Sequence, residues 1–577
     1  MWTVARGRFA WLLPSLLFVV MAVCFFVANR AAYHGYFTDD ELDNLYITRY
    51  MSSGQFALAL FSPQYYEANF RPAGHFYFHA LGNTAGLDFA PYVAILQIVH
   101  LLNVALLWFV LRRLALPFWA TAAGALFFAF HMAAFDIFWK PMYVFDLLCA
   151  TFCLLSLLFW LDDRWILSLL SFWIAYRAKE MAVMLPLALG AADFLMGKRR
   201  WPRLIPFFAI SLWFGLHGLG ATRSPAGYQF HYDLASLWKA VLFYSSRLVL
   251  LPYTGLVLLP LLLLLPLVTP PLVRDRIVWW GTIIFAVLLL PMLLLSDKMS
   301  SAYLYAPLIG LSIVVARVAA RQRTAVIVVF FALWIPWNYV NLRWLRRDAL
   351  SQADDRRRYV GTLVELMRTQ PDLRAFIYRD TPVFSDWGAR STLGWLHPDD
   401  PITLAREDSP QAAAVLKAPA LAVLDWNAIE HRLETVVRKR DTPDVSYLEM
   451  GYRTPVWQLT AGWLPNDRFS KFRWTRPHAA VRLHRPADAT QFELIAAVSD
   501  DYIGKVHHSH IEVAVNGRPV GSADFDHSGL QTVHWKLDQA PAGEAEITID
   551  TSPPYPGQNP LGIAVVSCGF LPRDESR

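Results

Sequence analysis

The sequence predicts a polytopic α-helical membrane protein with about eleven transmembrane helices, followed by a soluble α/β module and a β-sandwich. The 577 residues are 55% hydrophobic and 17% charged, and the mean hydropathy is +0.33. This composition is too apolar and too poor in charge for one soluble domain. Apolar segments recur as far as residue 342, and short strand-like runs replace them from Gly462 onward. The chain is therefore expected to combine a membrane domain with soluble modules.

The apolar run that begins at Phe9 follows Arg6 and Arg8, as it would in a signal peptide. It is about 20 residues long, enough to span a bilayer, and further apolar segments follow, so we predict an uncleaved first helix. The expected spans cover residues 9–28, 90–111, 118–135, 143–161, 165–177, 181–196, 203–220, 249–268, 277–296, 302–318 and 325–342. The fifth and sixth are short and meet at Arg177-Ala178-Lys179-Glu180, which indicates broken or half-length helices.

Basic residues indicate the orientation, because Lys and Arg collect in short cytoplasmic loops. One side of the predicted topology carries dense basic clusters in short loops, and the other side spreads its basic residues over longer loops. The clusters include Arg112-Arg113, Lys198-Arg199-Arg200 and Arg321. We therefore predict a bacterial inner-membrane protein with a cytoplasmic N-terminus and with the first loop and C-terminal modules in the periplasm or outside the cell. Arg343, Arg346 and Arg347, just after the last span, run against this rule.

Three consecutive acids, Asp39, Asp40 and Glu41, follow Thr38 in the first loop, residues 29–89. Thr38 and Glu41 form a capping-box pattern, and acids favour the positive end of a helix, so a structural role explains them locally. We expect this helix to run from Asp39 to about residue 52 and to be closed by Gly54. The other explanation is catalytic, because an enzyme acting on lipid-linked substrates needs carboxylates at the boundary between water and membrane.

Other charged residues fall at predicted helix ends on the same side as these acids. An ionised side chain in hydrocarbon costs about 2.5 to 3.5 kcal/mol on insertion scales, so each of them needs a partner. Asp136 and Lys140 are spaced four residues apart, as a helical ion pair would be, and Lys179-Glu180 would suit an interfacial anchor. The full set comprises Asp136, Lys140, Asp146, Arg177, Lys179, Glu180, Arg247, Asp297 and Lys298.

The soluble half divides into two patterns. Residues 343–456 alternate helix-like segments with short apolar runs such as Ala375-Phe376-Ile377-Tyr378, which predicts a small α/β module. Residues 457–577 read as a β-sandwich, and Asn516-Gly517 is a hairpin turn signal. This sandwich is a candidate carbohydrate-binding domain, because Trp463, Trp474 and Trp535 would either stack on sugar rings or fill the core. The transmembrane domain is predicted to occupy residues 1–342.

Several short motifs occur together in the membrane half. They are the acidic loop after the first span, the Arg71-Pro72 pair before the second long helix, Lys179-Glu180 followed by Pro186, and Tyr303-Leu304-Tyr305-Ala306-Pro307. In these features the chain resembles the GT-C superfamily of glycosyltransferases that use polyprenyl-phosphate sugars, such as protein O-mannosyltransferases and the aminoarabinose transferase of lipid A. Residues 462–572 also resemble β-sandwich domains attached to bacterial glycosyltransferases.

The resemblance implies inverting transfer of a sugar from a polyprenyl-phosphate donor to a glycan, lipid or protein acceptor at the periplasmic face of the bilayer. It implies that Asp39 or Asp40 is the catalytic carboxylate, with Glu41 adjacent. The implied contacts to the lipid phosphate are Arg71, Lys140, Lys179 and Lys298, and Asp136 is the implied acid near the acceptor. The predicted substrate-binding set is completed by His75, Arg177, Glu180, Tyr303 and Tyr305.

A divalent metal such as Mg²⁺ or Mn²⁺ at Asp39 and Asp40 is the alternative use of the acids. The spaced Asp-x-Asp of metal-using relatives is missing, so we expect metal independence. The histidines and the four cysteines lack metal-ligand or redox spacing. No run combines Lys or Arg with aromatic residues as a nucleic-acid groove would, so no nucleic-acid partner is predicted.

Two functions from other classes compete with a transferase. A transporter or flippase of a lipid-linked substrate would also place charged residues in its spans, although the halves of this sequence show no internal repeat. A non-catalytic membrane scaffold would use the β-sandwich to bind glycan. Glycosyl transfer that depends on Asp40 would distinguish the enzyme from both alternatives.

Overall fold

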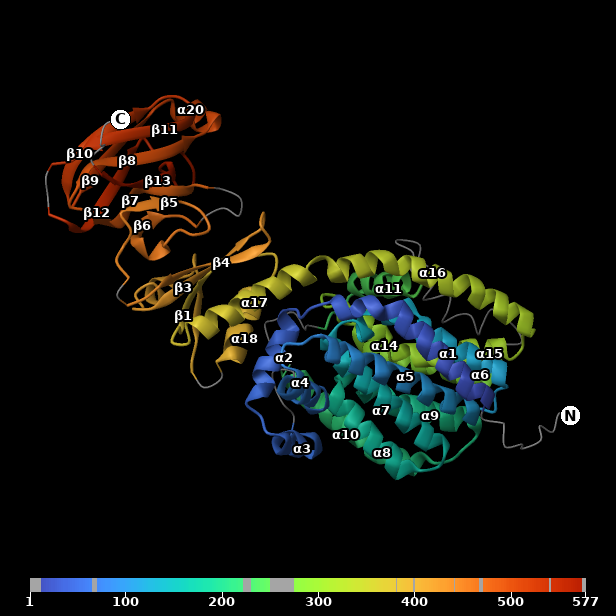
Figure 1. Ribbon diagram of the computed structural model, residues 1–577. Helices are drawn as coiled ribbons and strands as arrows, with labels where there is room; N and C mark the ends of the chain where they lie inside the picture. Colours follow the sequence, from blue (N-terminus) through green and yellow to red (C-terminus); the bar gives the residue numbers. More distant parts are fainter. Residues whose placement is uncertain are drawn as a thin grey trace. The chain divides into compact units, whose positions relative to one another are not determined.

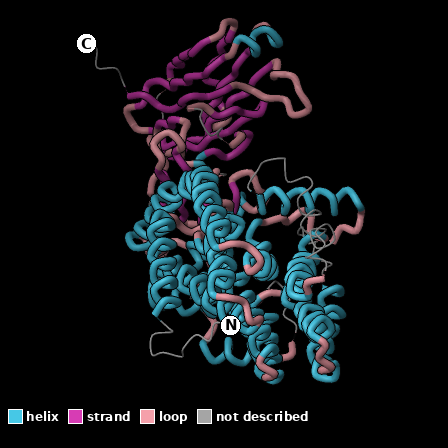
Figure 2. The backbone as a smooth tube through the Cα atoms, turned by 90° about the vertical axis from the view of Figure 1, so that its right-hand side faces the viewer, coloured by secondary structure: helices cyan, strands magenta, loops and turns pink. Residues whose placement is uncertain are grey.

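The computed structural model describes residues 12–64, 70–221, 230–249, 274–379, 381–397, 400–440, 442–465, 471–538 and 541–572. The chain divides into two compact units, Met1–Asp354 and Asp355–Arg577. Helices make up the first unit, and the strands gather in the second (Figures 1 and 2). The eighth expected span, 249–268, lies outside the described residues apart from its first position.

Each of the other expected spans contains a described helix. The first unit comprises α1 (Leu12–Asn29), α2 (Asp39–Arg49), α3 (Ser53–Phe61), α4 (Pro72–Ala85), α5 (Ala90–Arg113), α6 (Phe118–Phe130), α7 (Val144–Leu161), α8 (Trp165–Ala178), α9 (Leu185–Met196), α10 (Trp201–Ala221), α11 (Leu234–Val249), α14 (Arg276–Leu293), α15 (Pro307–Ala319) and α16 (Thr324–Ser351). Short 3-10 helices join several of them: η1 (Arg30–His34), η2 (Met132–Phe138), η3 (Pro141–Tyr143), η4 (Glu180–Met184) and η6 (Ser301–Leu304).

Helix length limits how many of these elements cross a bilayer alone. Within the described residues, 5 helical stretches are long and apolar enough to do so, or 6 if α6 and η2, bent by 59°, form one broken span. α8 and α15 are apolar but shorter. At 1.5 Å per residue, α8 is about 21 Å long against a hydrocarbon core of about 30 Å. The chain is thus a multi-pass membrane protein by composition, and the number eleven stays a prediction.

The break expected between the fifth and sixth spans is present. α8 ends at Ala178, Lys179 is extended with φ −160° and ψ 143°, and η4 precedes α9. α9 has only 12 residues. The chain therefore crosses this region as two short helices with a charged, non-helical joint between them.

Small residues allow close helix packing in the middle of the unit. A Cβ added to Gly281 on α14 would lie 2.6 Å from the carbonyl oxygen of Gly310 on α15, and one added to Gly124 on α6 would lie 2.8 Å from the Ala316 side chain on α15. Membrane helices associate through such small-residue contacts, because lipid supplies no hydrophobic force between them.

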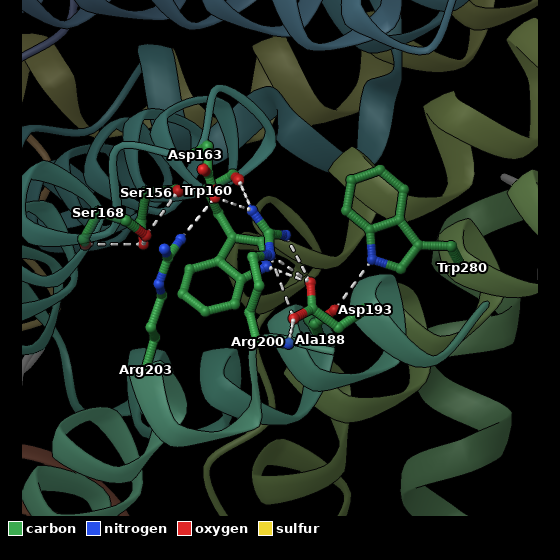
Figure 3. Close-up of polar contacts among 9 residues, drawn as sticks. All are labelled: Ser156, Trp160, Asp163, Ser168, Ala188, Asp193, Arg200, Arg203 and Trp280. Atoms are coloured by element: carbon green, nitrogen blue, oxygen red, sulfur yellow. Dashed lines mark hydrogen bonds and ion pairs between the residues drawn. The ribbon is translucent and has the colours of Figure 1, made fainter. Parts of the chain in front are cut away.

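A buried polar network lies at the C-terminal end of α7, where α7, α9 and α10 meet (Figure 3). Asp193 is fully buried and accepts hydrogen bonds from Trp160 Nε1 at 3.0 Å and from Arg200 at 2.5 Å. Arg200 also pairs with Asp163 at 3.1 Å, and Arg203 pairs with the same carboxylate at 2.6 Å. Because these donors come from α7, from α10 and from the segment just before α10, the network fixes how the helix ends pack.

In the second unit, α17 (Ala353–Thr369) leads into a four-stranded sheet. Its order is β2 (Thr403–Arg406), β1 (Ala375–Tyr378), β3 (Leu421–Asn427), β4 (Arg432–Arg438), with β1 parallel to β2 and β3 and with β4 antiparallel. α18 (Asp386–Leu396) and α19 (Ala412–Val415) connect the strands. The first unit ends at Asp354 instead of residue 342, because α16 continues to Ser351.

The expected β-sandwich is confirmed in outline. The strands are β5 (Tyr447–Glu449), β6 (Leu459–Trp463), β7 (Arg473–Arg485), β8 (Ala489–Val498), β9 (Ser509–Val515), β10 (Arg518–Phe525), β11 (Gly529–Lys536), β12 (Gly543–Ser552) and β13 (Ala564–Pro572), with the short helix α20 (Asp500–Val506) after β8. Seven of them pair in the order β10-β9-β12-β7-β13-β8-β11, while β5 pairs with β13 and β6 pairs with β7, all antiparallel. The Asn516-Gly517 turn joins β9 to β10 with both φ positive, as a tight hairpin requires.

The three tryptophans of the sandwich pack against its core. Trp535 is buried, and Trp463 donates its indole N–H to the Ala480 carbonyl at 2.7 Å. Trp474 is partly buried and stacks with Tyr502 at 6.1 Å between ring centroids. Core packing therefore accounts for their positions, and carbohydrate binding by this domain stays a prediction.

A buried charge cluster joins the two modules of the second unit. Arg379, just after β1, pairs with Glu407 at 2.6 Å and with Asp425, and Arg473 on β7 pairs with Glu407 at 2.7 Å. Burial raises the pKa of Asp425 to about 6, although Arg379 opposes the shift. Burial also acts on Glu407, but the two arginines hold the pKa of Glu407 below its usual value. These contacts tie the parallel sheet to the sandwich.

Replacing Asp193 with Asn tests the network of Figure 3. The change leaves the buried side of Arg200 without its charged partner, and breaking such a buried pair costs about 3 to 5 kcal/mol. We expect a clear drop in the melting temperature of the full chain in detergent. Asp163→Asn is the matched control, because Asp163 is 61% exposed and a surface pair is worth about 0 to 1 kcal/mol. Equal losses for the two variants would contradict this assignment.

Candidate functional site

The capping box expected at the acidic loop is present. Thr38 donates from its backbone N–H and its hydroxyl to Glu41 Oε2, both at 2.5 Å, and the Met142 N–H donates to Glu41 Oε1 at 3.3 Å. Glu41 is buried. Its carboxylate therefore begins α2 and fastens that helix to η3.

The expectation that Gly54 closes this helix is wrong. α2 ends at Arg49, and Ser52 instead caps α3 by accepting a hydrogen bond from the Gln55 N–H at 3.3 Å. Gly54 thus lies in the first turn of the next helix. A serine with glutamine three residues later is itself a capping-box signal, and it outweighs the glycine.

Asp40 is half-buried on the first turn of α2. Burial raises the pKa of its carboxyl, the negative charges of Asp39 and Asp43 raise it further, and the positive charge of Lys298 lowers it. Asp40 also acts electrostatically on the Tyr303 hydroxyl. A loop some 260 residues along the chain therefore lies within electrostatic reach of the acidic helix.

Arg71 caps α4 beside this loop. Its Nε lies 2.8 Å from Glu180 Oε1, and its guanidinium lies 5.4 Å from the Phe145 ring centroid. Burial acts to raise the pKa of Glu180, but the charge and hydrogen bond of Arg71 keep that pKa below its usual value. His75 is buried one turn later, and burial lowers the pKa of its imidazole to about 4, so it is neutral at pH 7.

Lys179 and Asp146 form a buried ion pair. The Lys179 ammonium lies 2.6 Å from both carboxylate oxygens of Asp146 and 4.3 Å from the Tyr303 ring centroid. Asp146 is absent from the predicted site residues, although the sequence carried a signal. It is an acid in an apolar helix with no cation on that helix, so its partner had to come from another segment.

A neighbouring group is built around Asp136. Its carboxylate pairs with Lys140 at 2.8 Å, as the four-residue spacing predicted, and accepts a hydrogen bond from the Ser301 hydroxyl at 2.6 Å. The Ser300 hydroxyl donates to the Tyr143 hydroxyl at 3.0 Å. Tyr143 lies within electrostatic reach of both Asp136 and Asp146, which links this group to the Lys179 pair.

We call these charged residues and Tyr303 the helix-end cluster. It comprises Asp40, Arg71, Asp136, Lys140, Asp146, Lys179, Glu180, Lys298 and Tyr303. Four acids and four cations from separate segments thus meet at one end of the first unit. That these residues share one side of a membrane stays a prediction.

Two of the predicted substrate-binding residues, Tyr305 and Arg177, have their described contacts outside the helix-end cluster. The Tyr305 side chain is buried, and its hydroxyl is bonded to His100 Nδ1 at 2.8 Å and to Asn103 Nδ2 at 3.1 Å. Arg177 donates to the carbonyl groups of Gln64 at 3.0 Å and Ala59 at 2.5 Å, which anchors α3. These contacts give both residues structural roles, and neither is joined to the helix-end cluster by a described contact.

A divalent cation fits the described residues poorly. Across the described part of the chain, no three His, Cys, Asp or Glu side chains gather in a way that could hold a metal ion. Asp40 instead has the positive charge of Lys298 nearby. We therefore derive no chemical step through a metal.

Comparisons with known proteins give only distant structural likeness. No protein-family model matches the sequence, and no curated protein matches it. Among solved structures, the arabinofuranosyltransferase AftD from Mycobacteria is 12% identical with a TM-score of 0.43, covering 99% of this chain and 59% of that one. The arabinosyltransferase EmbB from Mycobacterium smegmatis is 12% identical with a TM-score of 0.28, covering 99% of this chain and 66% of that one. This chain therefore spans about 59% to 66% of the length of these proteins.

The Lys179–Asp146 pair can be tested by paired substitution. Lys179→Met or Asp146→Leu alone leaves one buried charge unpaired, and we expect each to cost about 3 to 5 kcal/mol. The double variant removes both charges and should recover most of the lost melting temperature of the full chain. Additive losses in the double variant would show that the two side chains do not stabilise the fold as a pair.

Proposed function

We propose that this chain is an integral-membrane glycosyltransferase that moves a sugar from a polyprenyl-phosphate donor to an acceptor hydroxyl or amine. The observation that carries the proposal is that Asp40 lies within electrostatic reach of Lys298 and Tyr303, and that Tyr303 lies within reach of the Arg71–Glu180 and Lys179–Asp146 pairs. A carboxylate near a lysine, with further ion pairs at the ends of apolar helices, suits a donor with a phosphate at the membrane surface and a tail in the lipid. The proposal agrees with the GT-C resemblance of the sequence motifs.

In the proposed reaction, Asp40 is the general base. The acceptor oxygen or nitrogen forms a bond to the anomeric carbon, its proton passes to the Asp40 carboxylate, and the bond from the anomeric carbon to the phosphate oxygen breaks. The electron pair leaves on the phosphate, and attack from the opposite face inverts the anomeric centre. The raised pKa of Asp40 supports this role, because a base with a pKa nearer the working pH accepts a proton more readily.

The three acids of the loop receive different roles. Glu41 holds α2 to η3 through its two carboxylate oxygens, so we assign it a positioning role. Asp39 raises the pKa of Asp40 by its charge. Asp40 has a described electrostatic link to both Lys298 and Tyr303, and the proposal places the chemistry there.

The cations neutralise the donor phosphate and the leaving group. Arg71 suits two-pronged contact with phosphate oxygens, because a guanidinium carries five N–H donors in a planar fork. The positive charge of Lys298 acts on the Asp40 carboxyl, and the Lys179 ammonium lies against the Tyr303 ring. Charge stabilisation of a leaving phosphate in a partly dry site is a large catalytic term. Asp136 and Lys140 would border the acceptor side.

The proposal also places the cluster on the periplasmic side of a bacterial inner membrane, following the distribution of basic loops. The acceptor is a glycan, a lipid or a protein. The β-sandwich of the second unit would then hold glycan for the transferase. Because its three tryptophans pack against the core, other residues on its surface would bind the glycan.

Asp40→Asn tests the general base. We expect transfer by the purified chain, measured with a polyprenyl-phosphate sugar, to fall about 10² to 10⁴-fold, the usual contribution of a positioned base. Asp43→Asn is the matched control, because it removes a neighbouring carboxylate one turn along α2 and should keep transfer at high pH within a few-fold. Unchanged transfer in Asp40→Asn, with the fold intact, would remove the proposed base.

The pH profile of transfer supplies a test in which two variants should shift the acid limb in opposite directions. A base must be deprotonated, so transfer should rise with pH through the raised pKa of Asp40. Asp43 raises that pKa and Lys298 lowers it, so Asp43→Asn should shift the acid limb of kcat/KM to lower pH and Lys298→Gln should shift it to higher pH. Shifts in the same direction would contradict Asp40 as the titrating group.

A further inference from the structure

We propose that an anionic phospholipid of the surrounding bilayer binds in a groove between α1, α6 and α16, with its phosphate at Arg30, Arg343 and Arg346. All three helices contribute side chains to the groove. This site is separate from the helix-end cluster and does not depend on the proposed function.

The groove is apolar along its length. It has a volume of about 280 Å³, and its lining includes Leu17, Cys24, Phe25, Phe130 and Ile335. α1 and α16 are also the most exposed candidate spans, with 17% of each apolar window buried within the protein. Apolar side chains in an exposed membrane helix face lipid, so the groove opens toward hydrocarbon.

One end of the groove is polar and basic. Asn29, Asn338 and Tyr339 line it there. The guanidinium of Arg346 lies 4.6 Å from the Tyr339 ring centroid and donates to the Ala28 carbonyl. The charges of Arg343 and Arg30 also reach the Tyr339 hydroxyl.

These arginines lack acidic partners in the part of the chain that the structure describes. No described carboxylate lies within ion-pair distance of Arg30, Arg343 or Arg346. The Nε of Arg346 is in addition buried without a hydrogen-bond partner. Three cations gathered at the mouth of an apolar groove attract an anion that carries an apolar chain. Binding of a lipid phosphate would also explain why Arg343 and Arg346 follow the last span, on the side where the distribution of basic loop residues predicts few arginines.

The dimensions favour a bilayer phospholipid. The groove runs along α1 from Leu17 to Asn29, which is about 18 Å at 1.5 Å per residue. Half of a hydrocarbon core of about 30 Å is about 15 Å. The groove therefore matches an acyl chain within one leaflet, with the headgroup at the arginines.

The bound lipid would support the segment that carries Asp136. Asn29 accepts a hydrogen bond from Trp139 Nε1 at 3.0 Å, and Asn338 accepts one from the Met132 N–H at 3.2 Å. Both donors flank Asp136 in the sequence. A lipid that keeps α1 and α16 against η2 would thus stiffen the connection between α6 and α7, which contains Asp136.

The test is lipid titration of the detergent-purified full chain, followed by native mass spectrometry. The probes are phosphatidylglycerol, phosphatidylcholine with the same acyl chains, undecaprenyl phosphate and inorganic phosphate. We expect phosphatidylglycerol to bind about tenfold more tightly than phosphatidylcholine. Inorganic phosphate should not displace it, because the acyl chain supplies part of the affinity.

Two variants and one control make the result specific. The triple change Arg30→Gln, Arg343→Gln and Arg346→Gln should abolish the preference for phosphatidylglycerol, and Cys24→Trp should weaken binding of both phospholipids by filling the groove. Arg347→Gln, exposed on the same helix, should keep the preference. Equal binding of the two phospholipids, or an unchanged preference in the triple variant, would overturn the proposal. Displacement of phosphatidylglycerol by an equal concentration of undecaprenyl phosphate would also overturn it in favour of a prenyl-phosphate site.

Discussion

The buried pair between Lys179 and Asp146 is the contact on which the helix-end cluster depends. Lys179 stands at the only extended position between α8 and η4, so its backbone breaks the helix while its side chain holds the break against the start of α7. Both side chains are buried, and a buried charge without a partner is destabilising, so each requires the other. Because the break is fixed in this way, Glu180 can reach Arg71, and Tyr303 can lie over the ammonium.

The same constraint shapes the opposite end of the unit. Asp146 and Trp160 are fourteen positions apart on α7, or about 21 Å, and each belongs to a polar network. Asp275, at the start of α14, pairs with Arg317 at 2.7 Å and Arg321 at 2.5 Å, while the far end of α14 leads to Lys298. Ionisable groups thus occupy two layers with apolar helix between them, as the cost of charge in hydrocarbon requires. The layer that contains Asp193 and Asp275 fixes the helix ends. The layer that contains Asp146 and Lys298 gathers the residues suited to chemistry.

Local patterns predicted much of this arrangement. The apolar runs predicted the helices, the four-residue spacing predicted the Asp136–Lys140 pair, and the Thr38–Glu41 pattern predicted the capping box. Each of these depends on residues within a few positions of one another. The error at Gly54 is also local, because the cap at Ser52 competes for the same residues. The sequence indicated that Asp146 needs a partner but could not name Lys179 as that partner, since it lies 33 positions away.

The sequence by itself determined the membrane class, the placing of charged residues at helix ends and the start of the acidic helix, because apolar periodicity and capping are short-range properties. Only the tertiary structure decided which charges meet, that Tyr303 faces Lys179 while Tyr305 turns to His100, and that Arg346 borders an apolar groove. These outcomes depend on how distant helices pack, and the free energy of that packing comes from many weak contacts that no single stretch of the sequence contains.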